Sequence, residues 1–426
     1  MTTPTDHRIV PIALFATLFM LLSHAVAGGD DEPAQPQWFK GNTHTHTYWS
    51  DGNAAPEHVI DWYVKHDYDF LVLSDHNILS HGEMWYPLDR NDWRPLRPEH
   101  VEDLERRFGP DWVQTRTTDD GTKEMRLKTL PELRAKFERA GEFIMIQGEE
   151  ITDQFDRDPI HVNAINLQEL IEPQGGDSVR ETIQRNIDAV IEQSRQINRP
   201  MLAHLNHPNF GHSLTPTDVA AIKGERFFEV YNGHHSVRNH GDDNTPSMDQ
   251  MWDIALTLRL TEYDLGLLSG FATDDSHHHH GQGRTSQPGR GWVWVKADEL
   301  TPNAIVSALR AGDFYASTGV MLKDLGSSDR TLWLEIQPQD GVTYTTEFIG
   351  TRWRDGAVSA VGEVLATSNE LRPRYEMTGD ELYVRARVTS SREHPNPFAG
   401  GDMETAWVQP VLGQARGNIT AHEPGH

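Results

Sequence analysis

The feature that most restricts the fold is a regular alternation of short apolar runs with amphipathic stretches from Trp38 to about Val320. Each apolar run has the length of a buried strand, and the stretches between them carry apolar residues at helical spacing. This alternation is typical of parallel βα units, and about seven units favour a barrel, although an open doubly wound sheet would give similar periodicity. We therefore expect an α/β fold built on a TIM-like barrel.

The same pattern locates the expected elements. Helices are predicted at Pro56–His66, Val179–Asn198 and Thr215–Lys223, where proline or Thr215 stands near the first turn or apolar residues recur at helical spacing. A first strand is predicted to end near Thr43. The other predicted strands are Phe70–Ser74, Phe143–Gly148, His161–Asn166, Met201–Leu205, Phe227–Tyr231 and Leu265–Ala272.

Two regions depart from the barrel pattern, which we assign to residues 38–322. The charge-rich residues 85–138 predict a partly helical insertion over one barrel face. After Leu322, runs that alternate apolar with polar residues are separated by Gly, Asp and Ser, which predicts a small C-terminal antiparallel β domain at residues 323–412. Residues 413–426 are expected to form a loose tail.

The N-terminus predicts export. The apolar run Ile9–Leu22 is too short for a comfortable transmembrane helix, and Ala25-Val26-Ala27 resembles a signal-peptidase site. We interpret residues 1–27 as a signal peptide and residues 28–37 as a polar linker. The expected product is secreted or periplasmic, with no membrane anchor after cleavage; an uncleaved anchor is the alternative.

The composition excludes several classes of function. The chain has no Cys, which excludes disulfides, thiolate zinc sites and cysteine nucleophiles. Its 38 Lys and Arg against 64 Asp and Glu give a formal charge of -26, so a large nucleic-acid footprint is not expected. A small phosphorylated substrate is still compatible with this charge, because bound metal reverses the local field. No obligate protein partner is evident.

Potential metal ligands follow nearly every predicted strand. In a βα barrel these strand ends converge on one face, and imidazoles with carboxylates suit divalent Zn, Mn or Fe. In an H-x-H motif on a strand, both imidazoles point to the same side because side chains alternate with period two. The pattern therefore predicts a multinuclear metal site. The strand ends concerned carry His44 and His46, Asp75 and His76, Glu149 and Glu150, His161, His204 and His207, and Asp274, Asp275 and His277.

These residues form an ordered set of motifs. THTHTYWSDG, LSDHN, QGEEIT, the His161 segment, the HPN at His207 and DDSH resemble, in this order, the PHP superfamily, named for polymerase and histidinol phosphatase. They are most similar to its stand-alone predicted metal-dependent phosphoesterases, and the resemblance covers Trp38 to about Val320. It implies a distorted (β/α)7 barrel with two or three divalent metal ions (Zn, Mn or Fe). Such an enzyme hydrolyses phosphate mono- or diesters, including nucleotides or short oligonucleotides, with a metal-activated water.

The resemblance also implies a set of ligands. His44, His46, Glu150 and Asp275 would hold one ion; Glu150 would bridge to a second, held by His161 and His207; Asp51, His76 and His277 would hold the third. Glu150 is preferred over Glu149, and Asp275 over Asp274, because the family patterns are Gly-x-Glu and Asp-x-His. Many relatives carry an Arg shortly after the His-Pro pair, where this chain has Asn209 and Phe210.

Further polar residues near the strand ends are candidates for the reaction. His204, His234 and His278 are candidate proton donors to the leaving group, and Asn206, Asn232 and Tyr48 are candidate substrate contacts. Two other classes stay open: an amidohydrolase-like enzyme cleaving C–N or ester bonds, and a secreted metal-dependent binding protein. Amidohydrolase barrels usually carry a bridging Lys, which no predicted strand end supplies. Nine ordered ligands would exceed what binding alone needs, so an enzyme is favoured.

Overall fold

The computed structural model describes residue 1, residues 36–280 and residues 285–415. The predicted signal peptide and most of the predicted linker and tail lie outside the described residues. Within the described part of the chain, no helix has both the length and the apolar character required to cross a membrane.

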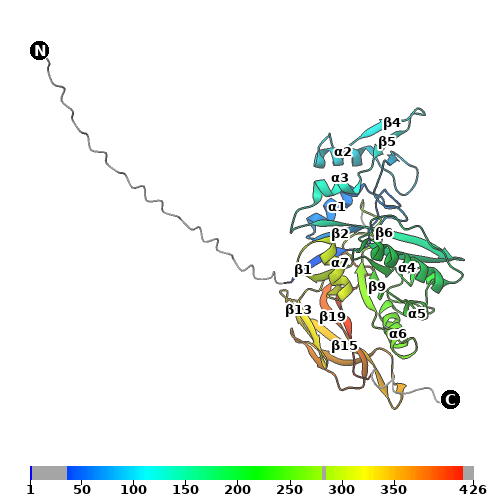
Figure 1. Ribbon diagram of the computed structural model, residues 1–426, viewed down its shortest axis with the longest axis vertical. Helices are drawn as coiled ribbons and strands as arrows, with labels where there is room; N and C mark the ends of the chain where they lie inside the picture. Colours follow the sequence, from blue (N-terminus) through cyan, green and yellow to red (C-terminus); the bar gives the residue numbers. More distant parts are fainter. Residues whose placement is uncertain (2–35, 281–284, 416–426) are drawn as a thin grey trace. The chain divides into compact units, whose positions relative to one another are not determined.

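A 14-stranded sheet runs through the described chain from Gln37 onward (Figure 1). Its strands, in spatial order, are β10 (Ser269–Thr273), β9 (Phe227–Asn232), β8 (Leu202–Leu205), β7 (Asp158–Ile165), β6 (Ile144–Phe155), β2 (Phe70–Leu73), β1 (Gln37–Asn42), β11 (Trp292–Ala297), β12 (Phe314–Ser317), β20 (Met403–Leu412), β19 (Glu381–Glu393), β15 (Tyr344–Arg354) and β16 (Ala357–Val358). The remaining strand, β17 (Glu363–Ser368), also pairs with β15.

The half of the sheet formed by the predicted βα units is mostly parallel. The pairs β1–β2, β2–β6, β8–β9 and β9–β10 are parallel, as the alternation predicts. β7 is an exception, because it lies antiparallel to both β6 and β8. Only Asp156 and Arg157 connect β6 to β7, with Asp156 at φ 53°, and so short a link makes a hairpin, whereas a parallel connection needs a crossover.

The sheet does not close, so the predicted (β/α)7 TIM-like barrel is not confirmed. Closure would require β10 to pair with the free edge of β1, but β11 occupies that edge in an antiparallel register from Gln37–Ala297 to Gly41–Val293. Instead, the segments that follow β1 and β10 meet through one parallel bridge between Thr45 and Ser276. Residues at the ends of these two strands are therefore brought together without a continuous barrel.

Helices cover the sheet and bury its apolar side chains. They are α1 (Pro56–Lys65), α2 (Pro98–Phe108), α3 (Leu130–Phe137), α4 (Val179–Ile197), α5 (Pro216–Ala220), α6 (Met248–Thr261) and α7 (Pro302–Ala311), with a 3-10 turn η1 (Phe210–His212). In β2 the side chains alternate: Leu71 and Leu73 pack in the cluster under α1 and α3, while Phe70 and Val72 belong to the cluster that includes α7.

The sequence predicted α1 and α4 closely and missed α6. Ser178 caps α4 by accepting a hydrogen bond from the Glu181 amide. Of the apolar residues that predicted the helix, Ile183, Ile187 and Val190 are buried and the others are partly buried. The predicted helix Thr215–Lys223 ends earlier, at Ala220. α6 is buried on most of its circumference, so it lacks the polar face that makes a helix recognisable in a sequence.

The C-terminal strands are antiparallel, as predicted, and they continue the same sheet through the β12–β20 pair. A separate three-stranded sheet contains β13 (Leu322–Ser328), β14 (Thr331–Ile336) and β18 (Arg374–Glu376). In residues 85–138, α2 and α3 accompany a second small sheet of β3 (Trp85–Pro87), β5 (Lys123–Arg126) and β4 (Thr115–Thr117).

Candidate metal centre

Two buried imidazoles form the base of the candidate site. His44 and His46 follow β1, and both are fully buried. The Nε2 atom of each lies 3.2 Å from Oε2 of Glu150 and 3.3 Å from Oδ1 of Asp275. Four donor atoms from β1, β6 and the end of β10 therefore face one point, as a four-coordinate ion requires.

Glu150 lies between two groups of histidines. Its Oε2 faces His44 and His46, whereas its Oε1 lies 2.9 Å from Nδ1 of His161 and 3.2 Å from Nε2 of His207. The β6–β7 hairpin brings His161 beside this carboxylate. A carboxylate that faces two donor groups with its two oxygens is placed to bridge two ions.

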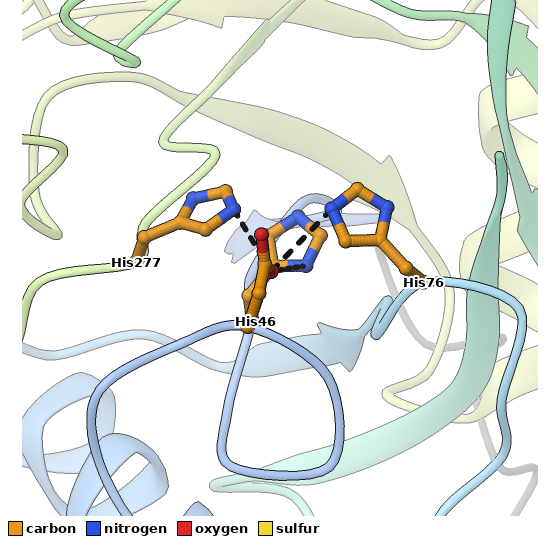
Figure 2. Close-up of side chains that lie close together, drawn as sticks. His46, His76 and His277 are labelled. Atoms are coloured by element: carbon orange, nitrogen blue, oxygen red, sulfur yellow. Dashed lines mark ion pairs between the residues drawn. The ribbon is translucent and has the colours of Figure 1, made fainter. Parts of the chain in front are cut away.

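A third group surrounds the carboxylate of Asp51. Its Oδ1 lies 3.1 Å from Nε2 of His277, 3.4 Å from Nε2 of His76 and 3.6 Å from Nδ1 of His46. Figure 2 shows the rings of His46, His76 and His277 directed toward one another. The Asp51 side chain is 40% exposed and that of His76 is 25% exposed, so this group forms the open side of the cluster.

All nine predicted ligands therefore meet in one cluster. The alternatives that the sequence analysis set aside point elsewhere. Glu149 is buried on the opposite side of β6, where it accepts a hydrogen bond from the Ile171 amide at 2.7 Å. Asp274 accepts hydrogen bonds from the amides of Gly289, Arg290 and Gly291.

The cluster fits divalent metal ions on the chemistry of its donors. Nε2 of His44, Nε2 of His46 and Oε2 of Glu150 are buried and have no hydrogen-bond partner among the described residues. Leaving three such atoms unsatisfied is costly, and a cation that accepts their lone pairs removes the penalty. The imidazole and carboxylate set suits borderline or hard divalent cations.

The electrostatics of the cluster also favour a cation. Burial alone would lower the pKa of His46, but the adjacent carboxylates of Asp275 and Glu150 outweigh it and raise the pKa to about 10. The imidazoles in turn hold the pKa of Glu150 and of Asp275 well below the usual range, against the effect of burial. In the absence of metal, the carboxylates therefore attract protons onto the histidines.

Two of the candidate ligands lie on backbone in the left-handed region. His207 has φ 23° and Asp275 has φ 46°, each just after the end of a parallel strand. The Asp275 amide donates to the His44 carbonyl at 3.0 Å, which ties the end of β10 to the end of β1. Strained conformations of this kind concentrate at functional sites, where the surrounding structure holds them in place.

A buried carboxylate that the sequence analysis gave no role, Glu229, orients the first histidine. Its Oε1 lies 2.7 Å from Nδ1 of His44, and its Oε2 accepts the amide of His207 at 2.7 Å. With Nδ1 engaged, His44 presents Nε2 to the metal position, the arrangement common to histidine ligands in metalloproteins. The sequence offered one sign of this role, since Glu229 is a charged residue inside an apolar strand, two residues before Tyr231-Asn232. It is not part of a motif such as H-x-H or Asp-x-His, so the sequence did not mark it as functional.

Asn206 and Asn232, predicted as substrate contacts, are buried and bind ligand carboxylates. Asn206 Nδ2 donates to Glu150 Oε1 at 2.8 Å. Asn232 Nδ2 donates to Glu229 at 2.8 Å and to Asp275 Oδ2 at 3.1 Å. These amides therefore position the carboxylates and do not face a substrate.

Tyr48 and His204 are also placed away from a substrate. Tyr48 is 2% exposed, stacks on Tyr86 and donates its hydroxyl to the Pro95 carbonyl, so it packs the insertion against the segment that follows β1. His204 is fully buried against Phe271, with Nε2 3.3 Å from the Thr43 hydroxyl, and burial lowers its pKa to about 4. We correct both predictions, since neither side chain reaches an open surface.

His234 and His278 lie near the cluster but are poor proton donors. The His234 ring is 5.2 Å from that of His277, and burial, followed by neighbouring histidines, lowers its pKa to about 3. Burial and the charge of His277 lower the pKa of His278 to about 4. Both rings are therefore neutral at pH 7, which argues against either candidate as the proton donor to the leaving group.

No family model matches the chain, and no curated protein does. Among solved structures, a two-domain protein from Bacteroides vulgatus that contains a predicted PHP-like metal-dependent phosphoesterase is 16% identical; the match covers 89% of this chain and 96% of that one, with a TM-score of 0.38. An amidohydrolase from Chromobacterium violaceum is 14% identical over 56% and 87% of the two chains, with a TM-score of 0.28.

A metal-dependent phosphoesterase candidate from Bifidobacterium adolescentis is 12% identical over 58% of this chain and 89% of that one, with a TM-score of 0.25. PHP-like metal-dependent phosphoesterases are thus among the structural neighbours of this chain. At these identities and TM-scores the similarity does not transfer an activity, so the function has to be inferred from the site itself.

Proposed function

We propose that this protein is a metal-dependent phosphoesterase of the PHP type. The observation that carries the proposal is the cluster of nine His, Asp and Glu side chains, in which Glu150 faces two donor groups and three buried donor atoms lack partners. A site that holds adjacent divalent ions is suited to the hydrolysis of phosphate esters.

The charge balance of the cluster favours an anionic substrate. Five buried or half-buried carboxylates stand in or behind it: Asp51, Asp75, Glu150, Glu229 and Asp275. Three divalent ions would bring six positive charges against these five negative ones. The local field would then be positive although the chain as a whole carries a formal charge of -26.

The nine side chains have distinct tasks in this proposal. His44, His46, Glu150 and Asp275 would hold one ion, Glu150 with His161 and His207 the second, and Asp51, His76 and His277 the third. When bound, such ions polarise phosphoryl oxygens and make water acidic enough to attack near neutral pH. Glu229, Asn206 and Asn232 fix the ligands before substrate arrives, which spares reorganisation during the reaction.

The substrate is proposed to enter on the open side, at Asp51 and His76. Here the insertion supplies a cation: Arg94 Nη1 donates to the carbonyl of Ser50 at 2.6 Å, next to Asp51. By contrast, Asn209, which follows the His-Pro pair, donates to the carbonyls of Arg238 and Pro246. We therefore assign to Arg94 the contact with a phosphate oxygen that Asn209 does not provide.

The cellular location of the protein is proposed from its N-terminal sequence. The apolar run Ile9–Leu22 and the Ala25-Val26-Ala27 pattern support export by a cleaved signal peptide to the periplasm or beyond. N-terminal sequencing of the protein recovered from an expressing cell is expected to begin near Gly28; a start at Met1 would contradict the proposal.

The activity can be tested with the full chain loaded with Mn, Zn or Fe. We expect hydrolysis of 4-nitrophenyl phosphate or of bis(4-nitrophenyl) phosphate, and the ratio of the two rates gives the mono- or diester preference. His46→Ala should abolish turnover and lower the amount of bound metal, because His46 supplies a buried nitrogen to the ion proposed between His44, Glu150 and Asp275. His240→Ala is the matched control, since His240 is 60% exposed and pairs with Asp402.

Two outcomes would overturn the proposal. Turnover by His46→Ala equal to that of the unmodified protein would remove the cluster from the reaction. Cleavage of an amide or carboxyl ester in place of either phosphate ester, with the same dependence on His46, would assign the protein to the amidohydrolase-like class.

A further inference from the structure

A cavity of about 1010 Å³ lies beside the metal centre and is separate from it. The end of α1, the start of β11 and residues 395–400 contribute to its wall, and so do His278 and His279, which directly follow the ligand His277. None of the nine proposed metal ligands lines it. The cavity is therefore a second candidate site, and two residues of its wall are adjacent in sequence to the candidate metal ligand His277.

The wall of the cavity combines aromatic rings with positive charge. Trp62, Tyr68 and Trp292 supply the rings, and Lys40, Lys65 and Arg290 supply the cations. Among the described residues that line it, Asp67 is the sole carboxylate. In a chain with a formal charge of -26, a wall with three cations and one carboxylate is a local exception.

Lys40 is held between the aromatic rings. Its Nζ lies 3.9 Å from the centre of the Tyr68 ring and 4.5 Å from that of Trp292, and it donates to the His66 carbonyl at 3.0 Å. Burial lowers its pKa to about 8, partly offset by Asp274 and Asp67, so the ammonium group is still mostly protonated at pH 7. The contacts keep a positive charge at the wall in a defined position.

The guanidinium of Arg290 is buried and has no carboxylate in ion-pair contact among the described residues; the buried Asp274, which accepts the Arg290 amide at 2.6 Å, acts on it only at longer range. The Arg290 side chain is 2% exposed, Nη1 donates to the Gly233 carbonyl at 2.7 Å, and Nε has no partner; within the described chain it forms no ion pair. A buried arginine is usually paired with a carboxylate. Arg385, which is equally buried, is paired with Asp253 at 2.7 Å and with Asp249 at 2.9 Å. An unpaired buried cation is unfavourable, and an anion at the wall would compensate it.

We propose that this cavity binds an organic anion that carries a planar ring. The anionic group pairs with Arg290 and Lys40, and the ring packs against Trp62 and Trp292. The proposal concerns binding and does not depend on the reaction at the metal centre, since the cavity has its own walls and its own charged groups.

The test is isothermal titration of the metal-loaded full chain with 1-naphthalenesulfonate, an aromatic anion that a phosphoesterase does not hydrolyse. The neutral 1-naphthalenemethanol is the matched probe for the ring alone. We expect the sulfonate to bind at least about tenfold more tightly than the alcohol, and Lys40→Met and Arg290→Met to remove this difference. Lys323→Met is the control, because Lys323 lies on β13 and pairs with Glu335.

A variant of the metal centre separates the two sites. His46→Ala is expected to bind the sulfonate as the unmodified protein does, and weaker binding there would place the probe on the metal ions and overturn the proposal. Equal affinity for sulfonate and alcohol, or an unchanged affinity in Lys40→Met, would also overturn it. Lys40→Met keeps the test decisive if Arg290→Met does not fold.

Discussion

At the scale of single residues, the metal cluster depends on side chains behind the ligands. Glu229 touches His44 and His207, and Thr273 Oγ1 and Asn232 Nδ2 in turn donate to Glu229 at 2.9 and 2.8 Å. The carboxylate is fully buried and belongs to none of the groups of donors that could hold an ion. Its contribution is therefore to hold a ligand in one orientation.

Glu229→Gln is expected to weaken metal binding by about 10- to 100-fold, because the amide is a poorer acceptor for His44 Nδ1 than a carboxylate. Titration against a chelating dye measures the affinity. Glu404→Gln is the control, since Glu404 is also buried but pairs with Arg392 on the C-terminal strands. An affinity that is unchanged in Glu229→Gln would show that His44 needs no orienting partner.

A second residue, far from the metal ligands in the chain, links stability to pH. Burial lowers the pKa of His394 to about 4, while an unfolded histidine titrates near 6.5. Between these values the unfolded state binds more protons, so the free energy of unfolding falls as the pH is lowered from 6.5 to 4. The loss is up to about 3 kcal/mol for this one group.

His394→Asn should make the free energy of unfolding depend less on pH between 6.5 and 4, because Asn does not titrate. Its side-chain oxygen can still accept the hydrogen bond that the Asn396 amide donates to Nδ1 of His394 at 3.0 Å. Urea unfolding at pH 7, 5.5 and 4.5 measures the difference between the two proteins. Parallel pH profiles would refute the assignment of the effect to His394.

At the scale of elements, β1 must approach β2 closely enough to align the two strand ends. A Cβ atom at Gly41 would lie 2.2 to 2.3 Å from ring atoms of Phe70, well inside contact distance. Glycine is therefore required at this point of the β1–β2 pair, three residues before His44. Phe70 is itself fully buried, so its ring cannot move into open space.

Gly41→Ala is expected to destabilise the protein by about 1–3 kcal/mol through overpacking. Thermal unfolding measures the effect as a lower Tm. Gly266→Ala serves as the control, because a Cβ there meets nothing within 4 Å. Equal Tm values for the two variants would mean that β1 and β2 can separate at no cost.

The insertion has a different role at this scale, since it reaches the open side of the cluster. Trp93 is 50% exposed with its ring 4.9 Å from that of His278, and Arg94 binds the Ser50 carbonyl. A loop that comes from outside the sheet thus contributes side chains next to Asp51. Loops held by a rigid scaffold commonly determine substrate preference.

Arg94→Met is expected to raise KM for the phosphate ester by about tenfold with little change in kcat, because a charged contact to the bound phosphate is lost. Steady-state kinetics separates the two constants. Arg90→Met, in the same loop, removes an arginine that pairs with Asp92 and should leave both constants unchanged. A fall in kcat at constant KM would instead give Arg94 a role in the reaction step.

At the scale of the whole molecule, one sheet joins the half that carries the metal cluster to the C-terminal strands. A buried ion pair strengthens the junction: Arg385 on β19 contacts Asp253 on α6 through Nε at 2.8 Å and Nη2 at 2.7 Å. The Tyr383 hydroxyl donates to the same carboxylate at 2.8 Å. Packing of α6 against β19 is therefore specified by charge as well as by apolar contact.

Asp253→Asn is expected to lower the free energy of unfolding by about 3–5 kcal/mol, because it leaves the Arg385 guanidinium buried with one carboxylate fewer. Urea unfolding followed by tryptophan fluorescence measures it. Glu376→Gln removes the partner of Arg374, a pair whose side chains are 60% and 63% exposed, and should change stability far less. A similar loss in both variants would contradict the buried pair as the stabilising feature.

The sequence by itself indicated the candidate ligands, through ordered motifs that resemble a known superfamily, and it predicted the parallel strands and the antiparallel C-terminal region. The strands follow from local rules, because buried strands read as apolar runs. The two-residue spacing of His44 and His46 predicted imidazoles on one side, and both rings do face the same carboxylates although they lie just after β1. Tertiary structure alone decided that β11 takes the edge of β1 in place of β10, and that Glu229 lies against His44. Pairing of edges and burial of a polar group depend on what other parts of the chain bring alongside, and no local pattern records that.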